Sequence, residues 1–335
     1  MTEVTISFPG IGIGEFTVDK VAFSLSIGKF DFDVRWYGII LTLGIIAGVL
    51  YTLYRSKHEG ISSEDVLDFS IWTVLLAIIG ARTYYVLTTL KTDSGEWNYH
   101  SFTDVIAVWE GGIAIYGAII GGALGIWVVS KIKKYNKTQL LKMTDMVAPG
   151  VMLGQIIGRW GNFINGEAHG VETAETFFLR MGLMGAADCK YPNKITYYHP
   201  TFLYESLWNL LGFILINYFY KKKKFDGQVI LMYLTWYGFG RMFIEGLRTD
   251  SLYIGVFRIS QVVGFLCFAI CGALLAYLLI RAKRREMDSL AYESLYEKSH
   301  SFSIIRDRSA ESAEAAEEEN NEEKEQEETE NDKAD

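Results

Sequence analysis

The segment GRWGNFINGEAHG, residues 158–170, places an arginine, two asparagines, a glutamate and a histidine at the end of a long apolar run. An arginine at the centre of a membrane helix is disfavoured by about 2.5–3.5 kcal/mol, so charged groups at such places are rare and usually functional. On a helix, Arg159 and Asn162 share a face because they are three residues apart. Gly166 is suited to end that helix, which would fold Glu167 over its mouth. This pattern predicts a buried polar site.

The planar guanidinium fork binds phosphate through paired hydrogen bonds, so buried arginines point to a phosphate-bearing ligand. Other apolar runs are also interrupted by charged or polar aromatic side chains, namely Tyr37, Arg82, Tyr116, Glu205, Arg241 and Glu245. Whether these side chains meet depends on the elements that carry them.

Long apolar runs are the elements that must position these residues. Three runs contain no charge and are long enough to cross a hydrocarbon core of about 30 Å; they are 36–54, 111–130 and 259–280. Four more runs contain one or two charges each, at 66–90, 144–165, 200–220 and 227–246. We therefore predict an all-α polytopic membrane protein with about seven transmembrane helices.

The basic residues predict how these helices are oriented, because lysine and arginine concentrate on the cytoplasmic side. Every second connection is basic, with Arg55 and Lys57, five lysines within 131–142, the run Lys221 to Lys224, and Arg281 to Arg285. The alternate connections, 91–104, 166–198 and 247–257, have few basic residues. This alternation places the N-terminus outside and the C-terminus in the cytoplasm.

Three regions follow from this topology. We expect an extracytoplasmic segment at residues 1–35, a seven-helix transmembrane domain at 36–285 that carries the polar site and an outer loop at 166–198, and a cytoplasmic tail at 286–335. The whole chain has a net charge of −8, but Ser309–Asp335 contains 13 acidic and 2 basic residues. That composition cannot bury a core, so we expect a disordered tail from about residue 309. No nucleic-acid partner is expected.

The predicted orientation brings the polar residues to one level. Arg159 lies about 15 residues along an outward-running helix, roughly 22 Å above its inner boundary. The same outer level is reached on five other helices by Arg82, Arg241, Tyr37, Tyr116 and Glu205. We interpret this convergence as a polar cavity open to the outer leaflet, with an anionic phospholipid headgroup as its ligand.

Each of these residues also has a simpler interpretation. Arg159 and Arg241 could extend to the outer headgroups, or Arg241 could pair with Glu245 one turn away. The asparagines could form hydrogen bonds between helices, and His169 could be a solvated loop residue. Three arginines at a similar depth, accompanied by two asparagines and two glutamates, favour the cavity.

Two further patterns concern packing. Gly117, Gly121 and Gly125 form a small-residue stripe at four-residue spacing, which predicts close helix packing, with dimerisation as the alternative. The segment VAFSLSIGKFDFDV, residues 21–34, alternates apolar and polar residues. We expect it to lie along the membrane surface as a strand or a loop.

The signature segment resembles the prolipoprotein diacylglyceryl transferase family. GRWGNFINGEAHG fits the family pattern of Gly-Arg, then Gly-Asn-Phe, then Asn-x-Glu-x-x-Gly. Other segments resemble the same family in the same chain order, namely RWYG, GAR, WEGGIAIYGAIIGG, HPTFLYES and YGFGRMFIEGLR. The resemblance covers about residues 22 to 285.

The resemblance implies an activity and its partners. Proteins of this family move the diacylglyceryl group of phosphatidylglycerol to the thiol of a lipobox cysteine in a prolipoprotein signal peptide, which forms a thioether and releases glycerol phosphate. By resemblance, Arg159 and Arg241 hold the phosphate and stabilise the charge that grows on it. The thiol must ionise, because the thiolate is the nucleophile. No metal or cofactor is expected, and the lipid bilayer is the remaining partner.

The resemblance also assigns supporting residues. Asn162, Asn165 and Tyr37 would orient the headgroup, while Glu167 and Glu245 would fix the arginines or accept hydrogen bonds from the glycerol. The remaining residues assigned to substrate binding are Gly158, Gly170, Arg248, Arg82, His199 and Glu205.

Tyr116 departs from the family pattern, which often carries a histidine at this place on the third helix, proposed as the base. A tyrosine with a pKa near 10 is a poor base at neutral pH. We expect Tyr116 to position substrate, with the thiol ionised by local positive potential. His199 is an alternative base, although a role at the start of the fifth helix is the simpler interpretation.

Three other classes of protein compete with this prediction. A transporter or channel would place polar groups at several depths and often has two related halves, neither of which the sequence contains. An intramembrane protease or lipid hydrolase needs a serine–histidine pair, two aspartates or a metal motif within the spans, and none of these stands out in this sequence. A non-catalytic scaffold, in which the arginines only form pairs, should tolerate Arg159→Lys moderately, whereas a bidentate phosphate site should not.

Overall fold

The computed structural model describes residues 2–27, 30–91, 95–108, 111–186, 189, 191 and 193–289. The predicted acidic tail from residue 309 lies outside these residues. The chain divides into two compact units, Met1–Leu275 and Ala276–Asp335. The predicted site lies within the first unit.

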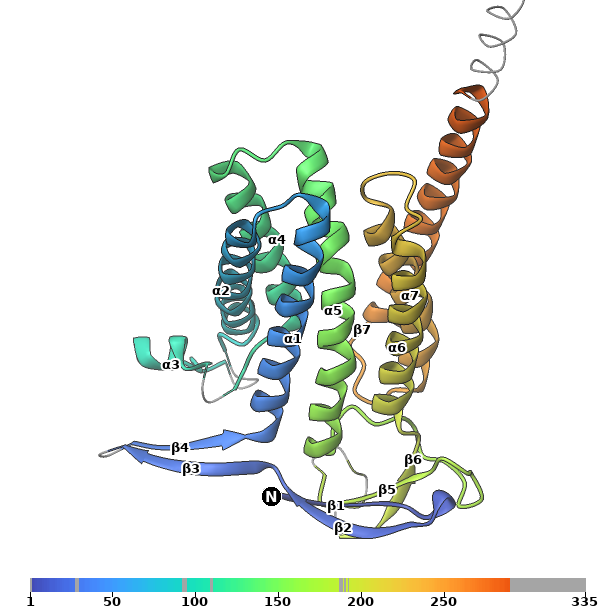
Figure 1. The fold of residues 1–335 in the computed structure, drawn as a ribbon. Helices are drawn as coiled ribbons and strands as arrows, with labels where there is room; N and C mark the ends of the chain where they lie inside the picture. Colours follow the sequence, from blue (N-terminus) through green and yellow to red (C-terminus); the bar gives the residue numbers. More distant parts are fainter. Residues whose placement is uncertain are drawn as a thin grey trace, which may run out of the picture. The chain divides into compact units, whose positions relative to one another are not determined.

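Long helices occupy all seven predicted apolar runs (Figure 1). They are α1 (Trp36–Glu59), α2 (Ser63–Thr88), α4 (Ile115–Ile132), α5 (Lys137–Asn165), α6 (Thr201–Tyr220), α7 (Gln228–Ile244) and a last helix, Ile259–Ser289. A short helix, α3 (Phe102–Ile106), lies between α2 and α4. Five of the long helices, all except α6 and α7, are long and apolar enough to cross a membrane. The chain is therefore a mostly helical, multi-pass membrane protein.

The all-α prediction holds for these helices, but the segments outside them also contain strands. The described residues contain eight strands, namely β1 (Glu3–Phe8), β2 (Ile13–Asp19), β3 (Val21–Ile27), β4 (Phe30–Arg35), β5 (Met181–Met184), β6 (Thr196–Tyr198), β7 (Tyr253–Ile254) and β8 (Phe257–Arg258). Within the alternating segment, β3 and β4 pair as antiparallel strands, so the strand interpretation is confirmed. Short 3₁₀ helices follow β1, at Pro9–Ile11, and α7, at Glu245–Leu247.

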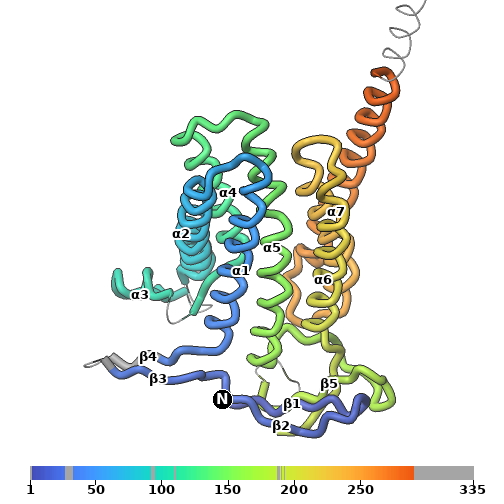
Figure 2. The backbone as a smooth tube through the Cα atoms, viewed as in Figure 1, coloured from blue at the N-terminus to red at the C-terminus, as the bar shows by residue number. Residues whose placement is uncertain are grey.

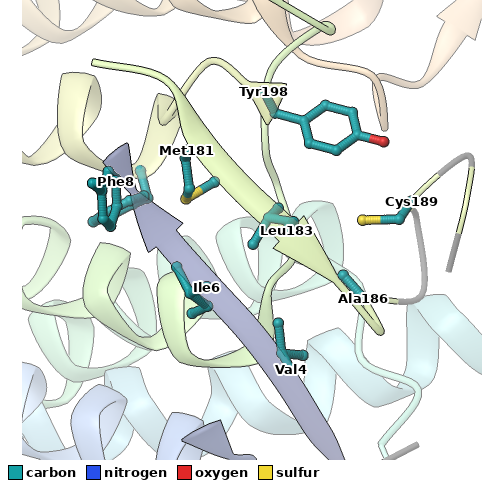
Figure 3. Close-up of a cluster of buried hydrophobic side chains, with 9 residues drawn as sticks. Val4, Ile6, Phe8, Met181, Leu183, Ala186, Cys189 and Tyr198 are labelled. Atoms are coloured by element: carbon teal, nitrogen blue, oxygen red, sulfur yellow. The ribbon is translucent and has the colours of Figure 1, made fainter. Parts of the chain in front are cut away.

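The largest sheet joins the start of the chain to the loop between α5 and α6. Its strand order is β2-β1-β5-β6, and Thr5 in β1 lies opposite Met184 in β5. Val4, Ile6 and Leu183 are fully buried on one face of this sheet (Figure 3). Phe163, in the last turn of α5, packs against this cluster, so the sheet covers the end of the helix that carries the signature segment.

The helices form close pairs, with α2 beside α4 and α1 beside α5 (Figure 2). The small-residue stripe of α4 faces α2, because a Cβ atom on Gly117 would lie 2.2 Å from the carbonyl oxygen of Gly80. A Cβ on Gly121 would lie 2.1 Å from the carbonyl oxygen of Leu76. The prediction of close helix packing at this stripe is confirmed.

A buried carboxylate joins α5 to the start of α7. Asp145 is fully buried and accepts hydrogen bonds from the backbone N–H groups of Gly227, at 2.8 Å, and Ile230, at 3.0 Å. These N–H groups belong to the first turn of α7 and have no partner within the helix. Asp145 therefore fixes the start of α7 against α5, and with it the course of the helix that carries Arg241.

Candidate active site

The signature segment lies at the end of α5, as the sequence predicts. The helix begins with a capping box formed by Asn136 and Gln139. It ends at Gly166, whose φ of 64° is left-handed and whose N–H bonds back to the carbonyl oxygens of Asn162 and Phe163. The predicted glycine cap is confirmed, and it turns the chain so that Glu167 lies beside Asn162.

Glu205, in the first turns of α6, is the centre of the site. Its side chain is buried, and only 4% of the residue is exposed. Arg159 of α5 pairs with its Oε2 atom. Arg241 of α7 pairs with its Oε1 atom at 2.5 Å, and Nη1 of Arg248 lies 3.6 Å from the same oxygen. Arg159 of α5, Arg241 near the end of α7 and Arg248 just after the following 3₁₀ turn thus bring their guanidinium groups to one carboxylate of α6.

Glu245 adds a second buried carboxylate, one turn after Arg241. Its Oε2 atom lies 2.6 Å from Nη2 of Arg241, so Arg241 bridges Glu205 and Glu245. The predicted pairing of Arg241 with Glu245 is present together with the convergence on Glu205. We call Arg159, Glu205, Arg241, Glu245 and Arg248 the Glu205 cluster.

Arg248 is held in place by Asp250. Its Nε and Nη2 atoms donate to the two carboxylate oxygens of Asp250, at 2.9 and 2.7 Å. Burial alone would raise the pKa of Asp250, but the adjacent Arg248 guanidinium lowers that pKa below its ordinary value. The backbone of Arg248 also forms a β-bridge with Gly170. This bridge ties the signature segment to the end of α7.

Asn162 links the cluster to Glu167. Arg159 Nη1 donates to Asn162 Oδ1 at 3.3 Å, and Asn162 Nδ2 donates to Glu167 Oε1 at 3.0 Å. The ring of Tyr37 lies against this turn of α5, since a Cβ atom on Gly161 would come within 2.8 Å of Tyr37 Cδ2. The structure therefore brings Tyr37, Asn162 and Glu167 to the level of Arg159.

The three arginine side chains are partly exposed. The side chain of Arg159 is 19% exposed, that of Arg241 15% and that of Arg248 11%. Counted with Asp250, three arginines face three carboxylates, so the charges balance. Such an arrangement can hold arginines in fixed orientations while their outer edges remain free to bind an anion.

Gly170 and His199 lie together in the loop next to the cluster. The N–H of Gly170 donates to the carbonyl oxygen of His199 at 2.8 Å, and a Cβ atom on Gly170 would lie 2.7 Å from His199 Cβ. His199 Nδ1 lies 3.2 Å from the hydroxyl of Tyr204, and burial lowers the pKa of this histidine. His199 thus stands directly before α6, as the simpler interpretation expects.

Two buried polar atoms near the signature have no hydrogen-bond partner within the part of the chain that the structure describes. They are Oδ1 of Asn165 and Nε2 of His169. His169 is 1% exposed and its ring packs on Tyr198, with 4.2 Å between centroids, so its interpretation as a solvated loop residue is wrong. His169 is buried because it packs on Tyr198, which belongs to β6 of the sheet that covers the end of α5.

Three predicted site residues have other contacts. Tyr116 lies in the first turn of α4, and its ring centroid is 6.3 Å from that of Tyr84 in α2. The guanidinium of Arg82 donates to backbone carbonyl groups of the segment before α4. Gly158 faces α1, where a Cβ atom would lie 3.9 Å from Leu41 Cδ1.

Sequence reasoning missed Asp250 and the central position of Glu205. The spacing of Arg248 and Asp250, two residues apart in a loop, was the available signal for their pairing. For Glu205, the signal was the lone carboxylate in an otherwise apolar run, which must find a cationic partner when it is buried.

A family model described as prolipoprotein diacylglyceryl transferase matches residues 20–277. Curated relatives named phosphatidylglycerol–prolipoprotein diacylglyceryl transferase include a protein of Finegoldia magna, 43% identical over 261 residues, which are 77% of this chain and 94% of the relative. The protein of that name from Clostridioides difficile is 41% identical over 270 residues, which are 80% of this chain and 98% of the relative. The one from Listeria innocua is 40% identical over 269 residues, 80% of this chain and 92% of the relative.

Proposed function

This chain belongs to the prolipoprotein diacylglyceryl transferase family, and we propose that the Glu205 cluster is the place where its reaction occurs. The chain is a transferase that moves the diacylglyceryl group of phosphatidylglycerol to prolipoproteins. The acceptor is the thiol of the lipobox cysteine in the signal peptide. The observation that supports this site best is the meeting of Arg159 and Arg241 at one buried carboxylate.

The phosphate of phosphatidylglycerol binds at the exposed edges of Arg159 and Arg241. Glu205 contacts both guanidinium groups from the buried side and orients them before substrate arrives. Prior orientation matters because donors that are already aimed at developing charge need no reorganisation in the transition state. Asn162, Asn165 and Tyr37 orient the glycerol headgroup, and Glu167 and Glu245 hold the arginines or accept hydrogen bonds from glycerol.

The transfer exchanges one bond for another. The cysteine thiolate attacks the glyceryl carbon that carries the phosphate ester, a carbon–sulfur bond forms, and the carbon–oxygen bond to phosphate breaks. Glycerol phosphate leaves with the electron pair, and its extra negative charge lies between the two arginines. Before the attack the thiol gives its proton to water, and the positive potential of the arginines favours the thiolate that remains. Tyr116 positions substrate in this scheme.

The proposed topology has seven transmembrane helices, an extracytoplasmic N-terminus and a cytoplasmic C-terminus, in the bacterial cell membrane. The site then faces the outer leaflet. This proposal is supported by the alternation of basic connections and by the position of Arg159 near the end of α5 that is opposite Lys137. Phosphatidylglycerol in the outer leaflet and an exported signal peptide would meet at that level.

The test uses purified protein, phosphatidylglycerol and a lipobox peptide, with the peptide mass as readout. Arg159→Lys and Arg241→Lys should each lower the turnover at least about 100-fold, because a lysine cannot replace a paired guanidinium fork. The matched control is Arg180→Lys, since Arg180 donates to a loop carbonyl at Phe177 and lies outside the cluster. No adduct with the wild type, or an undiminished adduct with Arg159→Ala or Arg241→Ala, would refute the proposal.

A further inference from the structure

Arg82 is a buried arginine outside the Glu205 cluster. It lies in the second half of α2 and is 8% exposed. Within the described residues, its contacts are with backbone carbonyl groups and with the ring of Tyr85, whose centroid is 5.7 Å from the guanidinium carbon. A buried guanidinium needs several acceptors, so the identity of these acceptors indicates what Arg82 does.

Four N–H groups of Arg82 hold the connection between α3 and α4. Nε donates to the carbonyl oxygen of Val105 at 2.8 Å, and Nη2 donates to that of Asp104 at 2.6 Å. Nη1 donates to the carbonyl oxygens of Gly111 and Gly112, at 2.7 and 2.9 Å. One side chain thus joins both ends of the connection.

These carbonyl groups are the ones that the local backbone leaves unpaired. Asp104 and Val105 lie in the last turn of the short helix α3, where carbonyl groups have no partner within the helix. Gly111 and Gly112 have φ angles of 92° and 69°, so the chain turns there in a left-handed conformation. Arg82 satisfies all four groups, and the negative end of α3 favours its positive charge.

The segment that Arg82 holds leads directly into Tyr116. The N–H of Ala114, the residue before α4, donates to the carbonyl oxygen of Ala81 at 3.1 Å. Gly117 then packs directly on Gly80 of the same helix, α2. Tyr116 therefore lies between two points fixed on α2, and the side chain of Arg82 fixes the chain immediately before them.

We propose that Arg82 is a positioning residue, which fixes the connection between α3 and α4 and through it the place of Tyr116. This inference rests on the proposed function, in which Tyr116 positions substrate. It replaces direct substrate binding as the role of Arg82. A lysine cannot substitute, because its three donors leave from a single nitrogen and cannot reach carbonyl groups on both sides of the guanidinium plane.

The first test is Arg82→Lys, measured by transfer kinetics and by amide hydrogen exchange. The turnover per folded molecule should fall by about 100-fold, as for a misplacement of about 1 Å at a reacting centre. The KM for phosphatidylglycerol should stay within about twofold, because no binding contact is lost. Amide exchange should rise in residues 103–108 and 111–117, while Arg180→Lys should change neither quantity.

A second variant disturbs the same contact without changing Arg82 itself. A Cβ atom on Gly112 would lie 2.7 Å from Nη1 of Arg82 and 2.5 Å from Cε1 of Tyr85. Gly112→Ala should therefore push the connection away from Arg82 and reproduce the fall in turnover with an unchanged KM. This variant keeps the inference testable if Arg82→Lys does not fold.

The outcomes separate the inference from the function on which it rests. If turnover stayed within about twofold of wild type although amide hydrogen exchange in the connection became faster, the contact between Arg82 and the connection would not matter for catalysis, and the inference would be overturned. A raised KM with unchanged turnover would assign Arg82 to substrate binding and also overturn the inference. Either result needs an active wild type, and a wild type without transfer would remove the proposed function together with this inference.

Discussion

Replacing Glu205 by glutamine tests the reasoning about the cluster most directly. Glutamine has the same shape as this side chain, which is only 4% exposed, but it lacks the negative charge with which Arg159 and Arg241 both pair. Removing one partner of a buried ion pair costs about 3–5 kcal/mol, because the other charge remains buried. With about 2–4 °C of melting temperature for each kcal/mol, the expected fall for Glu205→Gln is roughly 6–20 °C.

The same substitution should strengthen anion binding. Three arginines balance the carboxylates of Glu205, Glu245 and Asp250, so glutamine at 205 leaves one positive charge in excess. Glycerol 3-phosphate carries the glycerol and the phosphate group of the leaving product, because the acyl chains stay with the transferred diacylglyceryl group. It should therefore raise the melting temperature of Glu205→Gln by more than that of the wild type.

The assay is thermal unfolding of the detergent-purified protein with and without glycerol 3-phosphate. Glu15→Gln, an exposed change of the same chemistry on β2, is the control and should leave the melting temperature within about 1 °C of the wild type. If Glu205→Gln matched this control, the carboxylate would not be a buried partner of the arginines. If the ligand stabilised both proteins equally, the charge balance would be the wrong explanation.

Three further predictions concern the surroundings of the site. Burial lowers the pKa of His199 below 6.5, so the stability that the neutral ring contributes is complete above pH 6.5 and is lost as the pH falls through the folded-state pKa. Between pH 6.5 and that folded-state pKa, the melting temperature of His199→Asn should therefore depend less on pH than that of the wild type. Gly166→Ala should destabilise by about 1–3 kcal/mol more than Gly12→Ala in thermal unfolding, because both positions have a positive φ but only Gly166 would bring its Cβ within 2.9 Å of a neighbouring side chain. Gly117→Ala should cost at least about 1–3 kcal/mol in the same assay, since its Cβ would overlap a backbone oxygen of α2, whereas Gly122→Ala, with 3.6 Å of clearance, should be nearly neutral.

The helices were predictable because membrane spans carry a strong local signal. Each apolar run became a helix, and the errors lie at the ends, where capping decides the boundary. The second helix begins at Ser63, three residues before the run, because the Ser62 side chain caps it. The helix α5 begins at Lys137, seven residues before the predicted run 144–165, where the Asn136 capping box starts a polar first turn. Hydropathy alone does not register these hydrogen bonds.

The strand pairing and the ion pairs within the site were harder to predict from the sequence. The strand β1 pairs with β5, which lies far away in the sequence, so no local pattern predicts the sheet. The convergence of Arg159, Glu205 and Arg241 at one level followed from helix rise and charge bias. Which carboxylate stands between the arginines did not, because it depends on how α5, α6 and α7 are rotated against one another. The contacts of Arg82 could not be predicted for the same reason, because its hydrogen-bond acceptors lie in a connection whose course depends on tertiary contacts.

The pairing of β1 with β5 has a consequence for biogenesis. Thr5 and its partner Met184 are 179 positions apart, and translation at about 5–20 residues per second separates their synthesis by roughly 10–40 s. During that interval β1 can pair with β2 but not with β5, so Val4 and Ile6, which end up fully buried, lie in a ribbon with one open edge. The nascent chain must keep this ribbon from aggregating until four long helices, α1, α2, α4 and α5, have been made, so slowed elongation within that window should reduce the yield of assembled enzyme.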